Sequence, residues 1–338
     1  FRGPRRDGKV GPLDLFRGTT AGDAVGPYLS QFLLKPIPFT PIVIDQKIRT
    51  AVPGLDYLTA EDSWLAIQNG QLAGVNQFAK EPLYLRNGRD LGEYVHRDFS
   101  YQPYLSACLQ ALKWGTPVDG GNPYKHSRTQ SAFATFGQPY LLGLLATVTQ
   151  SALGACWYQK WRVHFRLRPE EYGGRIASQL ARRLDLPIPT SLLASRALAE
   201  TRAKGSALLP QAYPEASPIH PSYPSGHAAI AGACVTALKA CLDESHVVPE
   251  PVEPAPDGRT LTRFNGPPLT IGGELDKLAA NISIGRNFAG IHYRSDAAEG
   301  LLQGEEIAIR ILAEMKLTGG EIFAGWSLRK FDGRRLEI

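Results

Sequence analysis

The sequence predicts an all-α protein, a helical bundle preceded by an irregular N-terminal arm. Apolar residues recur at helical spacing in successive segments after residue 58, as amphipathic helices require. Residues 1–58 are rich in Gly, Pro and β-branched residues without sustained periodicity, which indicates an extended arm. With 338 residues, 43% of them hydrophobic and 20% charged, the chain can bury a sizeable core. We therefore expect an arm over 1–58 and one helical domain over 59–338.

Helices account for most of the expected elements. Thr59 followed by Glu61 and Asp62 has the acidic first turn of a helix start. We expect further helices over residues 105–114, 139–161, 170–184, 191–204, 226–242, 274–288 and 293–315. Residues 247–268 carry six prolines and predict a surface loop. The Phe-Asp-Gly run at 331–333 predicts the turn of a short C-terminal hairpin.

Composition argues against several classes of protein. The excess of 37 basic over 32 acidic residues is small and spread along the chain, which does not favour nucleic acid as a partner. The four cysteines show no CxxC spacing, so buried free thiols are expected. The charge-free stretch 129–159 is long enough to be weighed as a membrane span, but polar residues interrupt it and a core helix is expected instead. A soluble protein is expected; the chain begins at Phe1 with any targeting segment absent, so its compartment stays open.

A first group of polar residues follows the charge-free stretch. Lys160 and Arg168 flank a run that also contains Arg162, His164 and Arg166, and Pro169 follows directly. Such a run can simply be a solvated helix end whose cations complement the helix dipole. It can also bind an anion.

A second group surrounds a Pro-Ser-Gly turn. His220 and His227 flank this turn, and Ser225 and Gly226 stand at the start of a predicted helix. The backbone N–H groups of a helix start are free donors that suit an anion. A plain helix cap at Ser225 would explain the serine but not the two histidines.

A third group lies between the last two long helices. Asp296 follows His292 by one helical turn, and Arg286 stands six residues before His292. The carboxylate can fix the tautomer of the imidazole and leave its other nitrogen free to bind a metal or attack phosphorus. The plainer interpretation of His292 is a satisfied core histidine.

The three groups together resemble the superfamily of vanadium haloperoxidases and type 2 phosphatidic acid phosphatases. The shared pattern is Lys, seven residues, Arg-Pro; then Pro-Ser-Gly-His; then Arg, five residues, His, three residues, Asp, and it spans residues 160–296. Weaker similarity covers much of the remaining chain. The run Leu-Phe-Arg-Gly at 15–18 and the Phe-Asp-Gly run look like the carboxy-terminal half of red-algal and cyanobacterial bromoperoxidases. The fold implied is the helical bundle of this superfamily, and the domain over 59–338 would be the catalytic one.

The resemblance implies a vanadate cofactor and a role for each matching residue. Vanadate oxygens would be held by Lys160, Arg168, Arg286, Ser225 and the Gly226 N–H. His292 would ligate vanadium, with Asp296 behind it. His227 would act as acid or base, and Lys160 would polarise a bound peroxide oxygen. Trp157 and His220 would lie at the halide site.

The implied reaction is oxidation of a halide by hydrogen peroxide to hypohalous acid, which halogenates small organic nucleophiles. Bromide and iodide are expected as substrates because they are easier to oxidise, with chloride left open. The superfamily also implies a homo-oligomer. Longer relatives carry a further helical bundle before this region, so the sequence is a fragment or its other half is supplied separately.

Three departures from the family pattern bear on these roles. Arg168 leaves seven residues after Lys160, whereas the commoner pattern leaves six. The nearby Arg166 is therefore a rival of Arg168. Gly285 stands where the usual motif has Ser, so one supporting hydroxyl is missing. Trp157 is the residue type of fungal chloroperoxidases, whereas His220 has the bromoperoxidase identity.

Two alternative functions stay open at this point. An acid phosphatase could use the same cradle for phosphate, with His292 as the nucleophile that forms a phosphohistidine. A non-catalytic module that assembles an oligomer is the other alternative. The halide-site histidine favours the peroxidase, since a phosphatase does not need it.

Overall fold

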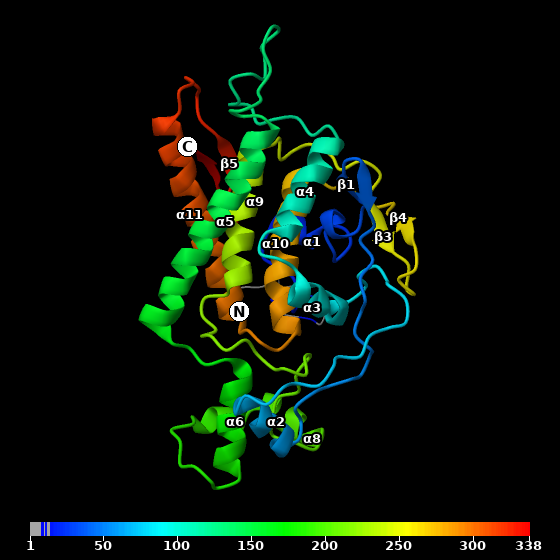
Figure 1. Ribbon diagram of the computed structural model, residues 1–338, viewed down its shortest axis with the longest axis vertical. Coiled ribbons are helices and arrows are strands. Elements are labelled where there is room, and N and C mark those ends of the chain that lie inside the picture. Colours follow the sequence, from blue (N-terminus) through cyan, green and yellow to red (C-terminus); the bar gives the residue numbers. More distant parts are fainter. Residues whose placement is uncertain (1–7, 10, 12–13) are drawn as a thin grey trace.

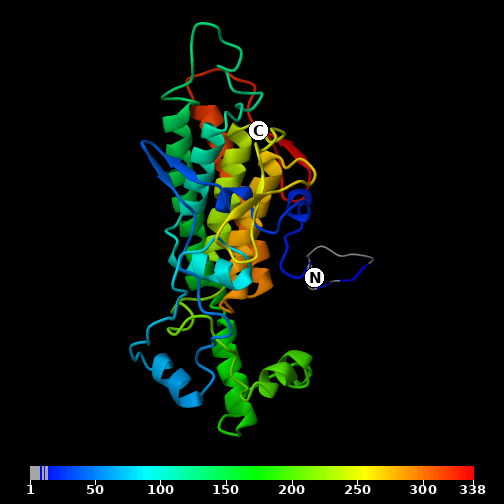
Figure 2. The same ribbon diagram turned by 90° about the vertical axis from the view of Figure 1, so that its right-hand side faces the viewer.

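The chain folds into an elongated bundle of α-helices, which confirms the predicted fold class (Figures 1 and 2). This computed structural model describes residues 8, 9, 11 and 14–338. The part of the predicted arm that falls on residues 1–7, 10, 12 and 13 lies outside the described residues. The longer helices are α3 (Gly88–Arg97), α4 (Gln102–Lys113), α5 (Gln138–Tyr158), α9 (Gly226–Cys241), α10 (Ile271–Phe288) and α11 (Arg294–Thr318). All of these except α3 run roughly along the vertical axis of Figure 1.

Helix α9 is the central helix of the bundle. Every residue from Ala228 to Ala240 is buried, as expected for a helix that is apolar on all sides. It packs against α5, α10 and α11. The buried Lys239 near its end is paired with Asp276 of α10 at 2.9 Å, so that charge has a partner. This packing fixes the position of the start of α9, where the Pro-Ser-Gly-His motif lies.

Helices α9 and α11 approach each other through glycines. A Cβ atom at Gly304 of α11 would lie 1.9 Å from the carbonyl oxygen of Ala229, and one at Gly232 of α9 would lie 2.1 Å from that of Leu301. Neither position can hold a side chain unless the two backbones separate. The contact brings the start of α9 against the start of α11, where the Ser225 N–H donates to the Asp296 carbonyl at 3.0 Å.

Helix α5 packs one face into the bundle, against α9 and α11. It continues into a π-helix over Gln159–His164. By length and composition, the helical run over 138–180 could cross a membrane, and 39% of its apolar window is buried. A single such helix is weak evidence, because core helices of soluble proteins meet the same criterion. The absence of a membrane span therefore stays a prediction. The four cysteines are free thiols, as expected.

A smaller group of helices lies at the lower end of the bundle in Figure 1. It consists of α2 (Glu61–Gln68), α6 (Pro169–Leu180), α7 (Thr190–Leu193) and α8 (Arg196–Ala203). The Trp64 indole N–H of α2 donates to Glu170 of α6 at 3.1 Å. The predicted helix over 191–204 is divided because Ser195 caps the start of α8 and lies outside the helix.

The strands form three two-stranded antiparallel hairpins within the described residues. They are β1 (Ile37–Phe39) with β2 (Ile42–Ile44), β3 (Val252–Pro254) with β4 (Leu261–Arg263), and β5 (Ser327–Arg329) with β6 (Arg335–Glu337). Pairing of Ile37 with Ile44, of Val252 with Arg263, and of Ser327 with Glu337 sets their registers. The predicted C-terminal hairpin is confirmed. The predicted surface loop over 247–268 instead contains the β3–β4 hairpin.

The segment before residue 59 is attached to the bundle at several points. It includes α1 (Ala21–Ala24) and a 3-10 turn over Gln31–Leu33. Phe32, Leu33 and Leu34 are at most 1% exposed and belong to the main hydrophobic core. The division of the chain at residue 58 stays a prediction, since the fold gives no independent boundary there.

Candidate active site

The three polar groups of the sequence meet at one end of the bundle. The first lies where the π-helix joins α6, the second at the start of α9, and the third between α10 and α11. Direct hydrogen bonds join them: Arg168 Nη1 lies 2.9 Å from His292 Nε2, and the Ser225 N–H donates to the Asp296 carbonyl. Residues 160 to 296 thus build a single site.

Lys160 and Arg168 are turned inward although they come from a basic segment. Lys160 lies in the π-helix and is fully buried, and its Nζ donates to the Pro221 carbonyl and, at 3.1 Å, to the Ser222 carbonyl. One extra residue per turn in a π-helix changes which side chains face the core, and such turns are frequent at functional sites. Cys156, one turn before Lys160, is also buried, and its thiol donates to the Pro224 carbonyl at 3.3 Å.

Arg168 joins all three groups. It stands at the start of α6, where Pro169 ends the preceding segment. Its Nε donates to the His220 carbonyl and its Nη1 to the Ile291 carbonyl, both at 2.9 Å. Its side chain is therefore fixed in the centre of the site. Arg166, its rival in the sequence, lies elsewhere: it pairs with Asp296 at 2.9 Å, and 40% of its side chain is exposed.

His292 is held between a carboxylate and the cations. Its Nδ1–H donates to Asp296 Oδ2 at 2.9 Å, and its Nε2 accepts from Arg168. Burial, followed by the charges of Arg168, Arg286 and Lys160, holds the pKa of His292 well below its usual range. The ring is therefore neutral, with Nε2 carrying a lone pair directed at the cationic part of the site.

The site contains three buried cations, and the acidic side chains near them do not fully balance their positive charge. Lys160, Arg168 and Arg286 are 0%, 1% and 6% exposed. Burial, with the charges of Arg168 and Arg286, lowers the pKa of Lys160 to about 8. Burial, with the charge of Arg286, lowers the pKa of Arg168 to about 10. The pKa of Arg286 is lowered by burial as well. Within the described part of the chain, the Nε of Arg286 is buried without a hydrogen-bond partner.

A bound anion would relieve the repulsion within this cluster. Two unit charges 4 Å apart repel each other by about 4 kcal/mol at an effective dielectric constant near 20. A tetrahedral oxyanion would offset these charges and offer an acceptor to the free Arg286 N–H. Ser225 and Gly226 begin a helix of 16 residues, whose first backbone N–H groups also favour an anion. The donor set of this site thus fits an oxyanion such as vanadate.

The second histidine of the Pro-Ser-Gly-His motif has a carboxylate partner that the sequence did not reveal. His227 Nε2 lies 2.9 Å from Asp98 Oδ1, and Asp98 follows the end of α3. This bond orients the ring and leaves Nδ1 as its free nitrogen. A single acidic residue 129 positions away carries no motif, so no sequence signal could have found it.

Trp157 and His220 lie side by side, as the expected halide site requires. Their ring centroids are 4.7 Å apart, and 43% of Trp157 is exposed. Burial, then the charges of Arg168 and Lys160, lowers the pKa of His220 to about 3. His220 is therefore neutral at physiological pH and presents an uncharged ring beside the cations.

The departure at position 285 has a packing cause. A Cβ atom at Gly285 would lie 3.1 Å from both Leu91 Cγ and Val95 Cγ1 of α3, closer than ordinary contact. A serine there would crowd the α3–α10 contact. With glycine at 285 in place of the usual serine, α3 can pack closely against α10. Helix α3 is the one that Asp98 follows.

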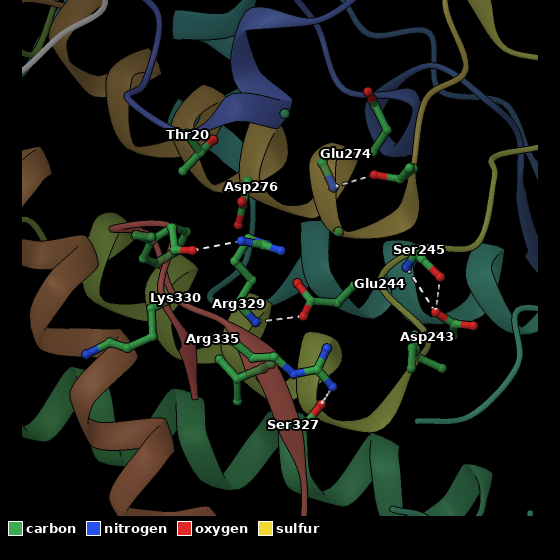
Figure 3. A pocket seen from close by; sticks show the side chains of 18 of the residues that line it. Thr20, Asp243, Glu244, Ser245, Glu274, Asp276, Ser327, Arg329, Lys330 and Arg335 are labelled. Atoms are coloured by element: carbon green, nitrogen blue, oxygen red, sulfur yellow. Dashed lines mark hydrogen bonds between the residues drawn. The ribbon is translucent and has the colours of Figure 1, made fainter. Parts of the chain in front are cut away.

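A large cavity lies away from these residues. Its volume is about 730 Å³, and it is bounded by α1, the start of α10 and the β5–β6 hairpin (Figure 3). Its acidic side chains, among them Glu244 and Asp276, face basic ones such as Arg329. The charges largely balance, and Lys239 pairs with both of the named acids. Size alone therefore does not identify a catalytic site here.

Comparison with known proteins shows what the chain is similar to. Residues 201–318 match the family model of the VCPO second helical-bundle domain. The chain is 38% identical to a vanadium-dependent bromoperoxidase of Corallina officinalis, 39% to that of Corallina pilulifera and 36% to that of Ascophyllum nodosum. These alignments cover 98–99% of this chain. Over almost its whole length, the chain is therefore similar to vanadium-dependent bromoperoxidases.

The fold agrees with that relationship. The homohexameric structure of the second vanadate-dependent bromoperoxidase from Ascophyllum nodosum matches with a TM-score of 0.90 at 33% identity, over 99% of this chain and 63% of that one. The chain spans 62–64% of the length of the three curated relatives named above. These haloperoxidase relatives do not favour the acid phosphatase alternative. Nor do they favour a purely structural module, because each is named for a bromoperoxidase activity.

Proposed function

We propose that this chain carries the catalytic site of a vanadate-dependent haloperoxidase, which oxidises halide with hydrogen peroxide to hypohalous acid. The product halogenates small organic nucleophiles. The observation that carries this proposal is the group of three buried cations around His292, whose Nε2 is held toward them by Asp296. A phosphatase would need only the cradle, whereas the neutral His220–Trp157 pair beside it suits a halide.

Each residue has a definite task toward the cofactor. Lys160, Arg168 and Arg286 would hold the vanadate oxygens, with the Ser225 hydroxyl and the Gly226 N–H completing the cradle. His292 Nε2 would ligate vanadium. When bound, vanadate supplies Lewis-acid activation of hydrogen peroxide without a change of its oxidation state. The chain must release Arg168 from His292 for this ligation, since its Nη1 now donates to the same nitrogen.

The remaining residues manage protons and the halide. His227, oriented by Asp98, is placed to take a proton from incoming peroxide and return it to a departing oxygen. Lys160 has three N–H donors, and a bound anion would displace the carbonyl contacts that it now makes. The Trp157–His220 pair would exclude water and admit a polarisable halide. Bromide and iodide are therefore the expected substrates, with chloride the harder one to oxidise.

The assembly is proposed to be a homo-oligomer of soluble subunits, without nucleic acid or a membrane as a partner. The homohexameric state named for the structural relative supports this proposal. The exposed face of α5, which includes Gly143, Thr147, Gln150, Ser151 and Gly154, is free of charge and offers one surface for contact.

The test is bromination of a phenolic dye by the purified chain with hydrogen peroxide and bromide. The dye should be brominated only after orthovanadate is added, and an excess of phosphate should slow the reaction by competing for the cradle. Absence of bromination together with hydrolysis of a phosphate monoester would reject the proposal. The same assay with iodide and chloride gives the order of halides.

A further inference from the structure

The role of Arg166 follows from two contacts that join Arg166, Asp296 and His292, the proposed vanadium ligand. Arg166 Nη1 lies 2.9 Å from Asp296 Oδ1. The second oxygen, Oδ2, accepts the Nδ1–H of His292, also at 2.9 Å. The two oxygens of one carboxylate thus join the guanidinium to the imidazole, so a shift of Arg166 changes the direction of the hydrogen bond that orients His292.

The carboxylate in the middle depends on this partner. Asp296 is fully buried, and leaving a buried carboxylate without its cation is strongly unfavourable. The Tyr293 N–H donates to Oδ2 at 3.0 Å, on the His292 side, and the Ser222 side chain also bonds the carboxylate. Both of these partners are neutral, and Lys160 acts on Asp296 only through its charge. Arg166 therefore supplies the charged partner on the Oδ1 side.

Arg166 itself is held in one orientation. The same Nη1 donates to Ser295 Oγ at 2.7 Å, and the guanidinium lies 4.3 Å from the centre of the Tyr293 ring. The Ser222 N–H donates to the Arg166 carbonyl at 2.9 Å, which ties its backbone to the segment before α9. A planar guanidinium stacked on a ring and bonded at its edge loses little freedom when it pairs.

We propose that Arg166 is a positioning residue, which holds Asp296 and through it keeps His292 Nε2 directed at vanadium. The inference rests on the proposed function, because it concerns the vanadium–nitrogen bond. Arg166 makes no contact with the bound oxyanion; it differs in this from Lys160, Arg168 and Arg286. It acts on the one contact that vanadate makes and sulfate does not, a bond from the central atom to a histidine nitrogen.

This difference provides a sharp experiment. Calorimetric titration of the full chain with orthovanadate and, separately, with sulfate measures the two affinities for the wild type and for Arg166→Ala. The vanadate Kd should rise about 10- to 100-fold, the usual effect of losing an outer partner of a metal-bound histidine. The sulfate Kd should change by less than about threefold, because sulfate is affected only by the loss of a distant positive charge, which salt screens. Vanadate is affected by that loss to the same extent.

The surroundings of Arg166 allow a rescue test. Arg166 lines an apolar cavity of about 480 Å³ with Tyr172, Leu198 and Tyr293. Truncation to alanine leaves space that opens on this cavity, so millimolar methylguanidinium can enter and pair with Asp296. It should restore most of the vanadate affinity of Arg166→Ala, and methylammonium, which lacks the planar fork, should restore much less. Arg175→Ala, on an exposed part of α6, is the control and should bind vanadate as the wild type does.

Each other outcome contradicts the inference. An unchanged vanadate Kd in Arg166→Ala would mean that Asp296 orients His292 without help. An equal loss of vanadate and sulfate affinity, not restored by methylguanidinium, would assign Arg166 a general structural role. If the wild type bound vanadate no more tightly than sulfate, the proposed function would itself fail, and that result is visible before any variant is made.

Discussion

His227 Nε2 lies 2.9 Å from Asp98 Oδ1, so a residue after α3 orients the histidine of the Pro-Ser-Gly-His motif. The side chain of Asp98 is only 3% exposed, whereas that of His227 is 30% exposed. A buried carboxylate thus fixes a ring that solvent and peroxide can reach. The proposed proton transfer through His227 would depend on this pair.

Asp98→Asn is expected to lower the bromination rate by about tenfold to a hundredfold. Asparagine keeps the shape of the side chain and an acceptor atom, but it removes the charge that stabilises a protonated imidazole. Steady-state kinetics with bromide and peroxide measure the effect. Vanadate affinity should not fall, since Asp98 acts on the cradle only through its negative charge near Arg286, and removing that charge favours an anion. Asp332→Asn on the C-terminal hairpin is the matched control, and a similar loss of rate in that variant would contradict the assignment.

Oxyanion affinity should decrease above pH 8. The pKa of Lys160 is lowered to about 8, so this cradle residue loses its proton as pH rises through that value. Sulfate is the suitable probe because it does not titrate in this range. The sulfate Kd is measured by calorimetry from about pH 6.5 to about pH 9.5, a range of about three units around that pKa. It should be constant below the pKa and increase above it. A Lys160→Ala variant should bind more weakly with a flatter profile; an equally steep profile in it would exclude Lys160 as the cause.

The same group affects stability with the opposite sign. The pKa of Lys160 in the folded state lies below its ordinary value of 10.5, so the unfolded chain binds more protons between about pH 8 and 10.5. This lysine therefore destabilises the anion-free fold most at low pH, and its unfavourable contribution disappears as pH rises through that window. Chemical denaturation of the wild type and Lys160→Met should show the difference in stability between them diminish from pH 8 to 10.

His292→Ala is expected to abolish vanadate-dependent turnover. The variant loses the nitrogen that would bind vanadium but keeps Lys160, Arg168 and Arg286. Sulfate binding should persist within roughly threefold of the wild-type Kd, since the variant loses only the nitrogen that would bind vanadium and keeps the three cations. Bromination and sulfate titration on the same preparation check the two parts. Retained bromination in this variant would remove the basis of the vanadate assignment.

His220→Ala is expected to act on the halide more than on the cofactor. Its neutral ring packs against Trp157 and accepts from Arg168 Nη2 at 3.1 Å. Removing the ring admits water beside the cations and should raise the KM for bromide about tenfold, the effect of about 1.4 kcal/mol of lost binding. Vanadate Kd should stay close to the wild-type value. An unchanged KM for bromide and iodide would place the halide elsewhere.

The contact between α9 and α11 sets the stability of the site as well as its geometry. Gly304→Ala places a Cβ atom on the Ala229 carbonyl, so the helices must separate, at a cost of about 1–3 kcal/mol or more. Thermal unfolding should show a markedly lower Tm. Gly154→Ala in α5 is the control: no heavy atom lies within 4 Å of its Cβ position, and the higher helix propensity of Ala should stabilise the fold by about 1 kcal/mol.

The elements that the sequence predicted correctly are those whose local pattern decides their structure. Helix α9 is apolar on all sides, and α11 has an apolar stripe, so both were expected close to their observed bounds. Helix α3 was missed because its buried face contains Asp90 and Glu93, which resemble solvent-exposed residues. Arg86 and Arg97 pair with them at 2.8 and 2.9 Å, and such tertiary compensation has no local signal.

The candidate site was predictable in its parts but not in its connections. Residue types and spacing identified Lys160, Arg168, Arg286, His292 and Asp296, because an oxyanion requires cations and donors. The spacing could not distinguish Arg166 from Arg168. Only the π-helix over Gln159–His164 and the turn after it direct Arg168 inward and Arg166 toward Asp296. Asp98 was invisible because its role depends on a contact between distant segments.

The burial of Cys156 affects how easily the hypohalous acid of the proposed reaction could oxidise the protein itself. Hypohalous acid readily oxidises thiolates to sulfenic and higher acids, and it oxidises the thioether of methionine to a sulfoxide. The thiol nearest the site is sealed inside the bundle, and burial raises its pKa to about 11. At neutral pH only on the order of one such thiol in ten thousand is the reactive thiolate. With a single methionine in 338 residues, the chain would offer the hypohalous acid of the proposed reaction few internal sulfur targets. Self-inactivation should therefore begin at exposed aromatic rings such as that of Trp157, not at sulfur.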